Sequence, residues 1–487
     1  MKNTENTINK KLEAFGLRVP EILLPAKIDL STWSVIACDQ YTQDLDYWKK
    51  AEAIVGDKPS TLNLILPEVY LNSPDKTQRI AKIRQSMKSY LGETQNGGEN
   101  LNAGGDQQNG SAGSVFAPAK KCFVYIERTT AFGRTRKGLV AQIDLDTYEW
   151  KPFSKANIRA TEATIVDRIP PRKEIRKGAP LELPHIMLLV NDKDDILVGG
   201  SGKRVKDDER ALLYSGELMN KGGSIKGWAL QSDDDVAAVT EAVSKIAEAN
   251  TAADGSTFLF AVGDGNHSLA TAKAVWDEYK AELIASGADD ETIANCPVRF
   301  ALVEIVNIYD SGLTFEPIHR VIFGVDNKKL IETLAEKLGG KVKTVASQKE
   351  LEEAVKNSWA NFGFDYVDED GSQKYVLLET SIKELAVSRL QPEIDEFLKT
   401  CTEAAGSGLV AGAGTSSGAP EIDYIHGTDE VLSLGKKPGA VGILLPPIAK
   451  DSFFETINGR GPLPRKSFSM GEADEKRFYL ECRKLFC

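Results

Sequence analysis

The stretch FLFAVGDGNHSLATAKAVWDE, residues 258–278, has the clearest structural pattern in this chain. An apolar run at residues 258–262 stops at the sequence GDGNH, residues 263–267. The residues that follow repeat apolar side chains at helical spacing: Leu269, Ala272, Val275, Trp276 and Tyr279. This order predicts a strand, a tight turn and a helix. Gly263 and Gly265 suit the turn, because glycine adopts backbone angles that other residues resist.

The turn carries an unusual concentration of polar chemistry. Asp264, Asn266, His267 and Ser268 place a carboxylate, an amide, an imidazole and a hydroxyl within five residues. The first N–H groups of a helix lack internal partners and carry partial positive charge, so a phosphate can bind there. A purely structural interpretation is also open: Asp264 and Asn266 can shape the turn, and Asn266 or Ser268 can cap the helix.

Composition limits the classes of protein that fit. The chain has 487 residues, 41% hydrophobic content and a net charge of −11. These values are typical of a globular protein of two to four domains, and the acidic balance argues against a nucleic-acid binder. The N-terminus has no signal-peptide core, and no apolar run is long enough to span a membrane. Six scattered cysteines without a CxxC motif favour a reducing compartment, so we expect a cytoplasmic protein without membrane or nucleic-acid partners.

Strand and helix patterns alternate along the chain, which predicts an α+β or mixed α/β fold. We expect strands at residues 33–38, 123–127, 139–144, 185–190, 300–308, 375–379 and 442–445, and helices at 76–91, 235–249, 328–338 and 473–485. The apolar run at 300–308 is also compatible with a helix. The segments 92–118, rich in Gly, Asn and Gln, and 404–420 are expected to be flexible insertions. The predicted division is an N-terminal part at 1–91, a central domain at 119–325 and a C-terminal part at 326–487.

Several other polar clusters are candidates for anion binding. The segment 159–176 contains Arg159 and Glu162 among several arginines, which can clamp phosphate or carboxylate groups; a solvated charged loop is the alternative. His319 and Arg320 lie between apolar runs, and His319 can equally be a core histidine. His426 has the same ambiguity, and Lys466 follows a Gly-rich turn that can also be an ordinary basic loop.

Familiar catalytic motifs are absent from the sequence. GxxxxGK[ST] does not occur, so the chain is not a P-loop NTPase. No GxSxG elbow is present, because the match at residues 414–418 lies in the Gly-rich segment 404–420 rather than between a strand and a helix pattern; HExxH is absent, and no GxGxxG follows a strand.

Taken in order, blocks of the sequence resemble one family. The blocks are PAKIDLSTWSVIACDQYTQDLDYW, RATEA, GDGNHSLATA, CPVRFALVEIVNIYDSGLTFEPIHR, DYIHG, GILLPP and LPRKSF. They resemble domain-of-unknown-function family 1015 (DUF1015), a bacterial and archaeal group, from Val19 to Leu485. The family's central motif, usually Asp-Gly-His-His-Arg, is similar to one in the ParB/sulfiredoxin superfamily, which includes archaeal kinases of free serine. The resemblance implies a ParB/sulfiredoxin-like portion around the central motif.

The resemblance also implies an activity. It points to a phosphotransferase or phosphatase of serine metabolism, acting on serine, O-phosphoserine or a similar small hydroxy amino acid, with Mg²⁺ and ATP or ADP as cofactors. By this analogy Asp264 binds Mg²⁺ or orients the nucleophile, His267 contacts the phosphoryl group or acts as acid–base, and Glu162 is the general base. The remaining phosphate- and substrate-binding residues are Gly265, Asn266, Ser268, Arg159, His319, Arg320, His426 and Lys466.

Two motif positions depart from the family pattern. Asn266 replaces the first histidine and Ser268 replaces the arginine, so the positive charge for a phosphate must come from elsewhere. Two other functions therefore remain open. One is a non-catalytic regulatory protein that binds a nucleotide or amino acid, and the other is a nuclease or DNA-binding protein.

Overall fold

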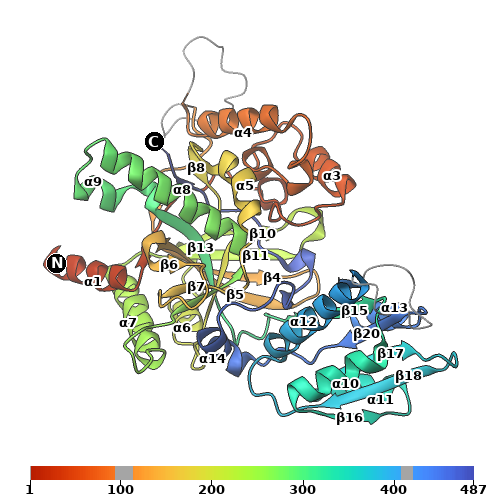
Figure 1. The fold of residues 1–487 in the computed structure, drawn as a ribbon. Coiled ribbons are helices and arrows are strands. Elements are labelled where there is room, and N and C mark those ends of the chain that lie inside the picture. Colours follow the sequence, from red (N-terminus) through yellow and green to blue (C-terminus); the bar gives the residue numbers. More distant parts are fainter. Residues whose placement is uncertain (1, 94–112, 407–419, 487) are drawn as a thin grey trace. The chain divides into compact units, whose positions relative to one another are not determined.

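A computed structural model describes residues 2–93, 113–406 and 420–486 of the chain (Figure 1). The fold is mixed α/β, as predicted. Contacts divide the chain into two compact units. The first comprises residues 1–160, 164–313 and 471–487, and the second comprises residues 161–163 and 314–470. Most of the two expected insertions, residues 94–112 and 407–419, lies outside the described residues.

A ten-stranded mixed sheet forms the centre of the first unit. The strand order is β10 (Leu212–Glu217), β11 (Ser224–Leu230), β4 (Phe123–Thr129), β5 (Thr135–Asp144), β13 (Phe300–Asn307), β9 (Met187–Val190), β12 (Phe260–Asp264), β7 (Ile158–Ala160) and β6 (Tyr148–Glu149), with β1 (Leu17–Arg18) paired beside β5. Neighbouring strands from β10 to β13 are antiparallel. In the rest of the sheet β13 and β9 are parallel, β9 and β12 are antiparallel, and β12, β7 and β6 are parallel.

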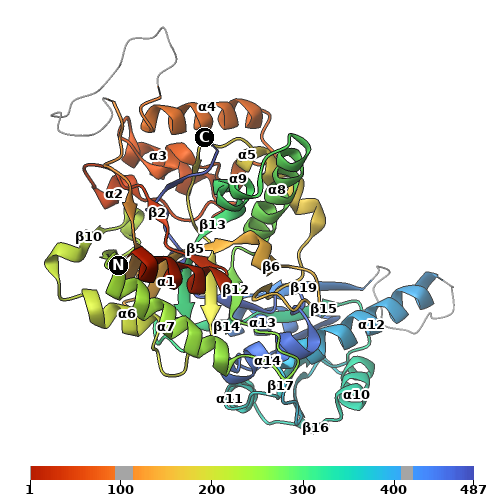
Figure 2. The ribbon, with the colours of Figure 1, turned by 90° about the vertical axis from the view of Figure 1, so that its left-hand side faces the viewer.

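Helices cover both faces of this sheet. Figures 1 and 2 show α6 (Val198–Val205) and α7 (Asp233–Ala249) on one side, and α5 (Ile169–Arg176) and α8 (Asn266–Ala285) on the other. Because both faces are covered, β9 and β13 are buried at every position, with no alternation between buried and exposed residues. All eight residues of β13 are buried. The other helices of the unit are α1 (Lys2–Ala14), α2 (Leu30–Trp33), α3 (Leu45–Val55), α4 (Lys76–Tyr90) and α9 (Asp290–Asn295).

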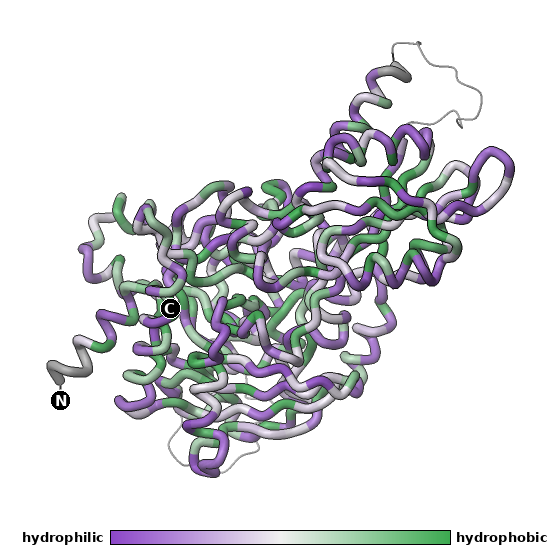
Figure 3. The backbone as a smooth tube through the Cα atoms, turned by 90° about the horizontal axis from the view of Figure 1, so that it is seen from below, coloured by the Kyte–Doolittle hydropathy of each residue, from purple (hydrophilic) through white to green (hydrophobic). Residues whose placement is uncertain are grey.

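The second unit is built on an antiparallel sheet of six strands. Their order is β16 (Lys341–Thr344), β18 (Gln373–Glu379), β17 (Phe362–Val367), β20 (Ala440–Leu444), β15 (His319–Phe323) and β19 (Glu421–Ile425). The helices of this unit are α10 (Asn327–Leu338), α11 (Gln348–Lys356), α12 (Ala386–Gly406), α13 (Thr428–Gly435) and α14 (Lys450–Arg460). In Figure 3 hydrophobic and hydrophilic stretches alternate along the backbone of the chain.

Three short pairs of strands complete the fold. In the first unit, β2 (Glu21–Ile22) pairs with β3 (Lys120–Lys121), and β8 (Leu181–Glu182) pairs with β22 (Arg483–Lys484). In the second unit, β14 (Phe315–Pro317) pairs with β21 (Phe468–Met470). None of the helices in the described part of the chain has the length and apolar character needed to cross a bilayer.

Most expected elements are confirmed. The predicted helices at 76–91, 235–249 and 328–338 correspond to α4, α7 and α10, and the central strand–turn–helix is β12 followed by α8. The strands expected at 123–127 and 139–144 are β4 and β5, which pair with each other. The remaining four expected strands are also present, as β9, β13, β18 and β20.

Two predictions were wrong, and one long-range contact explains both. Residues 33–38 are not a strand, because α2 ends at Trp33 and the segment makes a single bridge, between Ile36 and Phe478. Residues 473–485 do not form the expected helix, since only a single 3-10 turn, Ala473–Glu475, is helical. Their backbone pairs instead with the first segment, where the Tyr479 N–H donates to the Val35 carbonyl (2.8 Å) and the Ala37 N–H to the Arg477 carbonyl (2.9 Å).

Charged residues of the C-terminal segment are buried, which explains why its sequence pattern wrongly predicted a helix at residues 473–485. Arg477 and Glu481 are buried, and the Arg477 guanidinium donates to Glu304 (2.9 Å) and to Glu481 (2.8 Å). Arg136 also approaches Glu304, at 3.3 Å. A rule that places charged residues outside and apolar residues inside fails where buried charges are paired with one another.

Candidate functional site

The turn between β12 and α8 is set by an irregular strand ending. The register of β12 against β9 shifts between Val262 and Asp264, which is a bulge. Such bulges redirect side chains at strand ends. Gly265 then adopts the left-handed conformation (φ 82°, ψ 27°), and a Cβ there would lie 3.0 Å from the Ile186 side chain. Glycine is therefore required at this position by both backbone angle and space.

Gly265 is also the N-cap of α8, and no side chain caps this helix. The Leu269 N–H makes the first intrahelical bond, to the Gly265 carbonyl (3.0 Å). The Asn266 amide turns back to the Val262 carbonyl at 3.4 Å. The alternative in which Asn266 or Ser268 caps the helix is therefore not what the structure contains.

A buried lysine lies beside the turn carboxylate. Lys476 Nζ is 3.5 Å from Asp264 Oδ2. The Lys476 side chain is 10% exposed and that of Asp264 is 20% exposed. Because water is largely excluded from the pair, its electrostatic field is weakly screened. Lys476 supplies a positive charge at the turn, beside the Asp264 carboxylate.

His267 lies in the first turn of α8 and is oriented by the backbone. Its Nε2 accepts a hydrogen bond from the Ile165 N–H at 3.3 Å. Since Nε2 acts as an acceptor, the proton of the neutral ring is on Nδ1. The His267 carbonyl accepts from the Thr271 hydroxyl (2.7 Å), inside the helix.

Ser268 begins a chain of hydrogen bonds that leads away from the helix. Its hydroxyl lies 2.7 Å from His185 Nε2, and His185 Nδ1 lies 3.0 Å from the Tyr479 hydroxyl. The Tyr479 hydroxyl also accepts from the Cys38 N–H at 3.2 Å. Burial raises the pKa of Tyr479 well above its usual value, so the phenol keeps its proton. The imidazole of His185 is thus held between two hydroxyl groups.

Arg159 lies on β7, opposite Ala261 of β12. Its side chain is buried, its Nε donates to the Ala156 carbonyl (2.8 Å), and its guanidinium lies 4.6 Å from the centre of the Phe258 ring. Burial lowers the pKa of Arg159. The side chain is therefore anchored within the first unit near the beginning of β12.

The other predicted residues belong to the second unit. His319 is buried, and its Nδ1 accepts from the Leu445 N–H (3.0 Å). Burial, with the positive charge of Arg320 and His426, lowers the pKa of His319 to about 4. Arg320 is fully buried, donates to Gln391 Oε1 (2.8 Å) and has its pKa lowered to about 10 by burial. Its Nη2 has no hydrogen-bond partner among the described residues.

Glu162, Lys466 and His426 are more accessible. Glu162 is half-buried, and its Oε1 accepts from the Ser467 N–H at 3.4 Å. Lys466 is exposed in a left-handed conformation (φ 57°), and His426 is exposed after β19. The predicted site residues thus form two sets, one in each unit. Asp264, Gly265, Asn266, His267, Ser268 and Arg159 lie in the first unit, and Glu162, His319, Arg320, His426 and Lys466 in the second.

Sequence reasoning missed three residues at the turn: Lys476, His185 and Tyr479. Lys476 and Tyr479 lie in the segment that was misassigned as a helix, so their buried positions were not expected. The signal for His185 was its rarity, since the chain has four histidines. Among the described residues no group of three or more His, Cys, Asp or Glu side chains is placed to hold a metal ion.

Comparison with known proteins assigns the family. The sequence profile of the family described as "Protein of unknown function (DUF1015)" matches residues 22–95 and 108–396. The chain belongs to the DUF1015 family. No curated protein matches this member of the family.

Solved structures resemble this DUF1015 protein weakly. A conserved hypothetical protein from Pyrococcus furiosus is 12% identical, with a TM-score of 0.32 over 71% of this chain and 94% of that chain. An alanine variant of a free serine kinase in complex with AMP is 12% identical, with a TM-score of 0.33 over 71% and 91%. A C-terminally truncated SbnI from Staphylococcus aureus is 9% identical, with a TM-score of 0.29 over 68% and 82%.

Proposed function

We propose that this DUF1015 protein binds the phosphoryl group of a small phosphorylated molecule at the turn between β12 and α8. In the proposed reaction it transfers or removes that group on a small hydroxy amino acid, serine or O-phosphoserine. The observation that carries the proposal is the position of the Lys476 ammonium, 3.5 Å from Asp264, beside a helix that starts at a left-handed glycine. Phosphoryl transfer depends mainly on positioning and charge neutralisation, and this arrangement offers both.

Each group at the turn has a proposed role. Lys476 and the N-terminal dipole of α8 stabilise negative charge on the phosphoryl oxygens. His267, whose Nδ1 carries the proton, donates it to an oxygen of the leaving group or contacts the phosphoryl group. Ser268, held by His185, donates its hydroxyl to a phosphoryl oxygen. Asn266 contributes a neutral side chain in place of the family's histidine.

The bond changes are simple in either direction. In transfer to serine, the serine hydroxyl oxygen forms a bond to phosphorus, the bond to the donor's phosphate oxygen breaks, and the hydroxyl proton passes to a base. In hydrolysis, a water oxygen attacks the phosphorus of O-phosphoserine, the ester P–O bond breaks, and serine leaves with a proton from an acid. ATP or ADP is the proposed donor or acceptor in the transfer reaction.

Only one carboxylate of the turn, that of Asp264, is suited to hold Mg²⁺. Asp264 offers one carboxylate, and Mg²⁺ in phosphoryl-transfer sites is commonly held by one or two carboxylates together with substrate phosphates and water. Asp264 would hold the ion, which would neutralise charge on the phosphates. The neighbouring Lys476 reduces the electrostatic attraction of this carboxylate for a cation, so the nucleotide must bring much of the coordination.

The residues of the second unit are proposed separately. Glu162 remains the proposed general base, because its carboxylate is half-buried and accepts a hydrogen bond from the Ser467 N–H. Arg320 is the proposed anion-binding group, because it is fully buried and has an unbonded Nη2 among the described residues. His319, His426 and Lys466 stay as predicted members of this second set.

Phosphorus NMR with Mg²⁺ tests the reaction directly. One mixture contains L-serine with ATP or ADP, and the other contains O-phosphoserine with and without ADP. We expect turnover in one mixture and its loss in His267→Ala, with the fold intact by circular dichroism. Glu282→Gln, in the last turn of the same helix, is the matched control, because its side chain is 55% exposed and far along α8 from the turn.

Two results would contradict parts of the proposal. Full activity in His267→Ala would remove this histidine from the reaction. No turnover in any mixture, together with a rise in melting temperature on adding ATP, ADP or O-phosphoserine, would favour the non-catalytic regulatory protein, because a ligand that binds the folded state stabilises it.

A further inference from the structure

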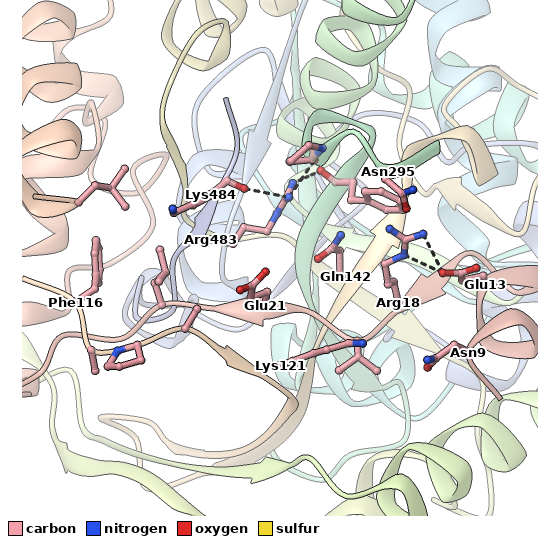
Figure 4. Close-up of a pocket in the computed structure, with 18 of the residues that line it drawn as sticks. Asn9, Glu13, Arg18, Glu21, Phe116, Lys121, Gln142, Asn295, Arg483 and Lys484 are labelled. Carbon is pink, nitrogen blue, oxygen red and sulfur yellow. Dashed lines mark hydrogen bonds and ion pairs between the residues drawn. The ribbon is translucent and has the colours of Figure 1, made fainter. Parts of the chain in front are cut away.

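A cavity lies in the first unit, at the end of the large sheet where β1 replaces β4 as the neighbour of β5. Its volume is about 910 Å³, which is within the usual range for small-molecule sites. The walls come from α1, β1, β2, β3 and the C-terminal β22, so segments from both ends of the chain meet here (Figure 4). None of its lining residues belongs to the turn described above.

The side-chain amide of Gln142 lines this cavity without a hydrogen-bond partner among the described residues. Gln142 is 8% exposed, and its side-chain amide has no hydrogen-bond partner among the described residues. A buried polar group that lacks a partner is unfavourable unless a ligand or water supplies one. Gln142 lines the cavity, so its amide is available to a molecule bound there. A glutamine amide presents a donor and an acceptor side by side, which matches the edge of an adenine base.

The guanidinium of Arg18, beside Gln142, is held in a fixed orientation against the Phe300 ring. Arg18 lies directly opposite Gln142 on the neighbouring strand. Glu13 fixes its guanidinium through contacts of 3.0 Å to Nε and 2.9 Å to Nη2, and the guanidinium lies 4.3 Å from the centre of the Phe300 ring. The plane of a guanidinium stacks on aromatic rings and on bases. Arg18 therefore offers a stacking surface next to the group that reads a base edge.

Basic side chains at the rim give the cavity a positive balance. Four basic and two acidic side chains line it: Arg18, Lys121, Arg483, Lys484, Glu13 and Glu21. Arg18 is paired with Glu13, and Arg483 with Glu182 outside the cavity. Lys121 and Lys484 make no ion pair with any described residue and are exposed. Glu21 lies opposite Lys121 on the paired strand, so the lining as a whole carries two more basic than acidic side chains, and in a chain with a net charge of −11 this local excess favours an anion.

From these contacts we infer that the cavity binds a nucleoside monophosphate, with its base edge on Gln142, its base plane against Arg18 and its phosphate at Lys121 and Lys484. The site is separate from the turn between β12 and α8, and it does not depend on the function proposed there. The nucleotide is a bound ligand at this site and undergoes no reaction in it.

Calorimetric titration with three probes tests the two halves of this recognition. AMP carries both base and phosphate, adenosine carries the base, and ribose 5-phosphate carries the phosphate. We expect AMP to bind more tightly than either fragment. Gln142→Leu should weaken AMP and adenosine about tenfold or more and leave ribose 5-phosphate unchanged, because a bidentate base contact is lost. The double variant Lys121→Gln with Lys484→Gln should weaken AMP and ribose 5-phosphate and spare adenosine.

Matched variants separate the site from general effects. Gln85→Leu changes an exposed glutamine on α4, and Lys226→Gln changes an exposed lysine on β11; neither residue lines the cavity. We expect both to bind AMP as the unmodified protein does. Gln142→Leu should keep its melting temperature, since the amide it removes has no partner in the described protein.

A photolabel locates the bound molecule. With 8-azido-AMP we expect crosslinks to peptides that line the cavity, and the same crosslinks in His267→Ala. Absence of AMP binding, AMP binding unchanged by Gln142→Leu, or labelling confined to the peptide around residues 263–268 would overturn the inference.

Discussion

Ser268 Oγ and His185 Nε2 lie 2.7 Å apart and join the first turn of α8 to the segment before β9. Ser268 stands where the family's motif usually has arginine, so this hydrogen bond occupies a position that otherwise carries charge. The positive charge at the turn comes instead from Lys476, about two hundred residues further along the sequence. In the proposed function, Lys476 therefore takes the place of a motif arginine as the positive group at the turn.

A double-mutant cycle measures the Ser268–His185 contact. Ser268→Ala and His185→Asn should each lower the free energy of unfolding, and the double variant should lose about 1 kcal/mol less than the sum, since the two changes remove one shared hydrogen bond. Urea unfolding gives the values. The control cycle combines Ser268→Ala with Ser232→Ala at the N-cap of α7, which shares no hydrogen-bond partner with Ser268, and its effects should add. An additive Ser268–His185 cycle would show that the contact contributes nothing.

Lys476→Met should slow the proposed phosphoryl reaction at the turn. Methionine has a similar length but no charge, so the packing is retained while the field at Asp264 is lost. We expect kcat/KM for the reaction found by phosphorus NMR to fall about 100-fold or more, as for other groups that stabilise charge in a transition state. Lys476→Arg should restore part of the activity because it restores the charge. Equal activity of the Met and Arg variants would rule out this electrostatic role.

Gly265→Ala tests the geometry that starts α8. Gly255 has the same φ of 82°, but a Cβ there would meet no atom within 4 Å, whereas at Gly265 it would approach Ile186. Both variants should lose about 1 kcal/mol of unfolding free energy from the left-handed backbone. Gly265→Ala should lose more and should also lose activity, since α8 must shift. Equal losses at the two positions would mean that the Ile186 contact is accommodated freely.

His319 predicts a pH dependence of stability in the second unit. Its pKa is lowered to about 4 in the folded protein, against about 6.5 in an unfolded chain. The unfolded state therefore binds more protons between these values, and the stabilisation is complete above pH ~6.5 and falls as the pH drops toward ~4. The full shift corresponds to about 3 kcal/mol. His319→Gln, which keeps an acceptor for the Leu445 N–H, should reduce this loss; urea unfolding across the range measures it.

Local patterns were enough to predict much of the fold. The apolar run and amphipathic repeat around GDGNH predicted β12 and α8, and the alternating elements predicted a mixed α/β protein. These features depend on neighbours within one turn or one strand, so they can be read from sequence. The segments around Ile36 and Phe478 failed because each is shaped by the other across more than four hundred residues of chain.

The candidate site divides in the same way. The sequence by itself determined that Asp264, Asn266, His267 and Ser268 gather at one turn, because adjacent residues on a strand–helix junction cannot lie far apart. It did not determine that Lys476 lies against Asp264 or that His185 and Tyr479 lead on from Ser268. Those contacts were decided by the tertiary structure, since burying the C-terminal segment required its charged and hydroxyl groups to find partners inside the first unit.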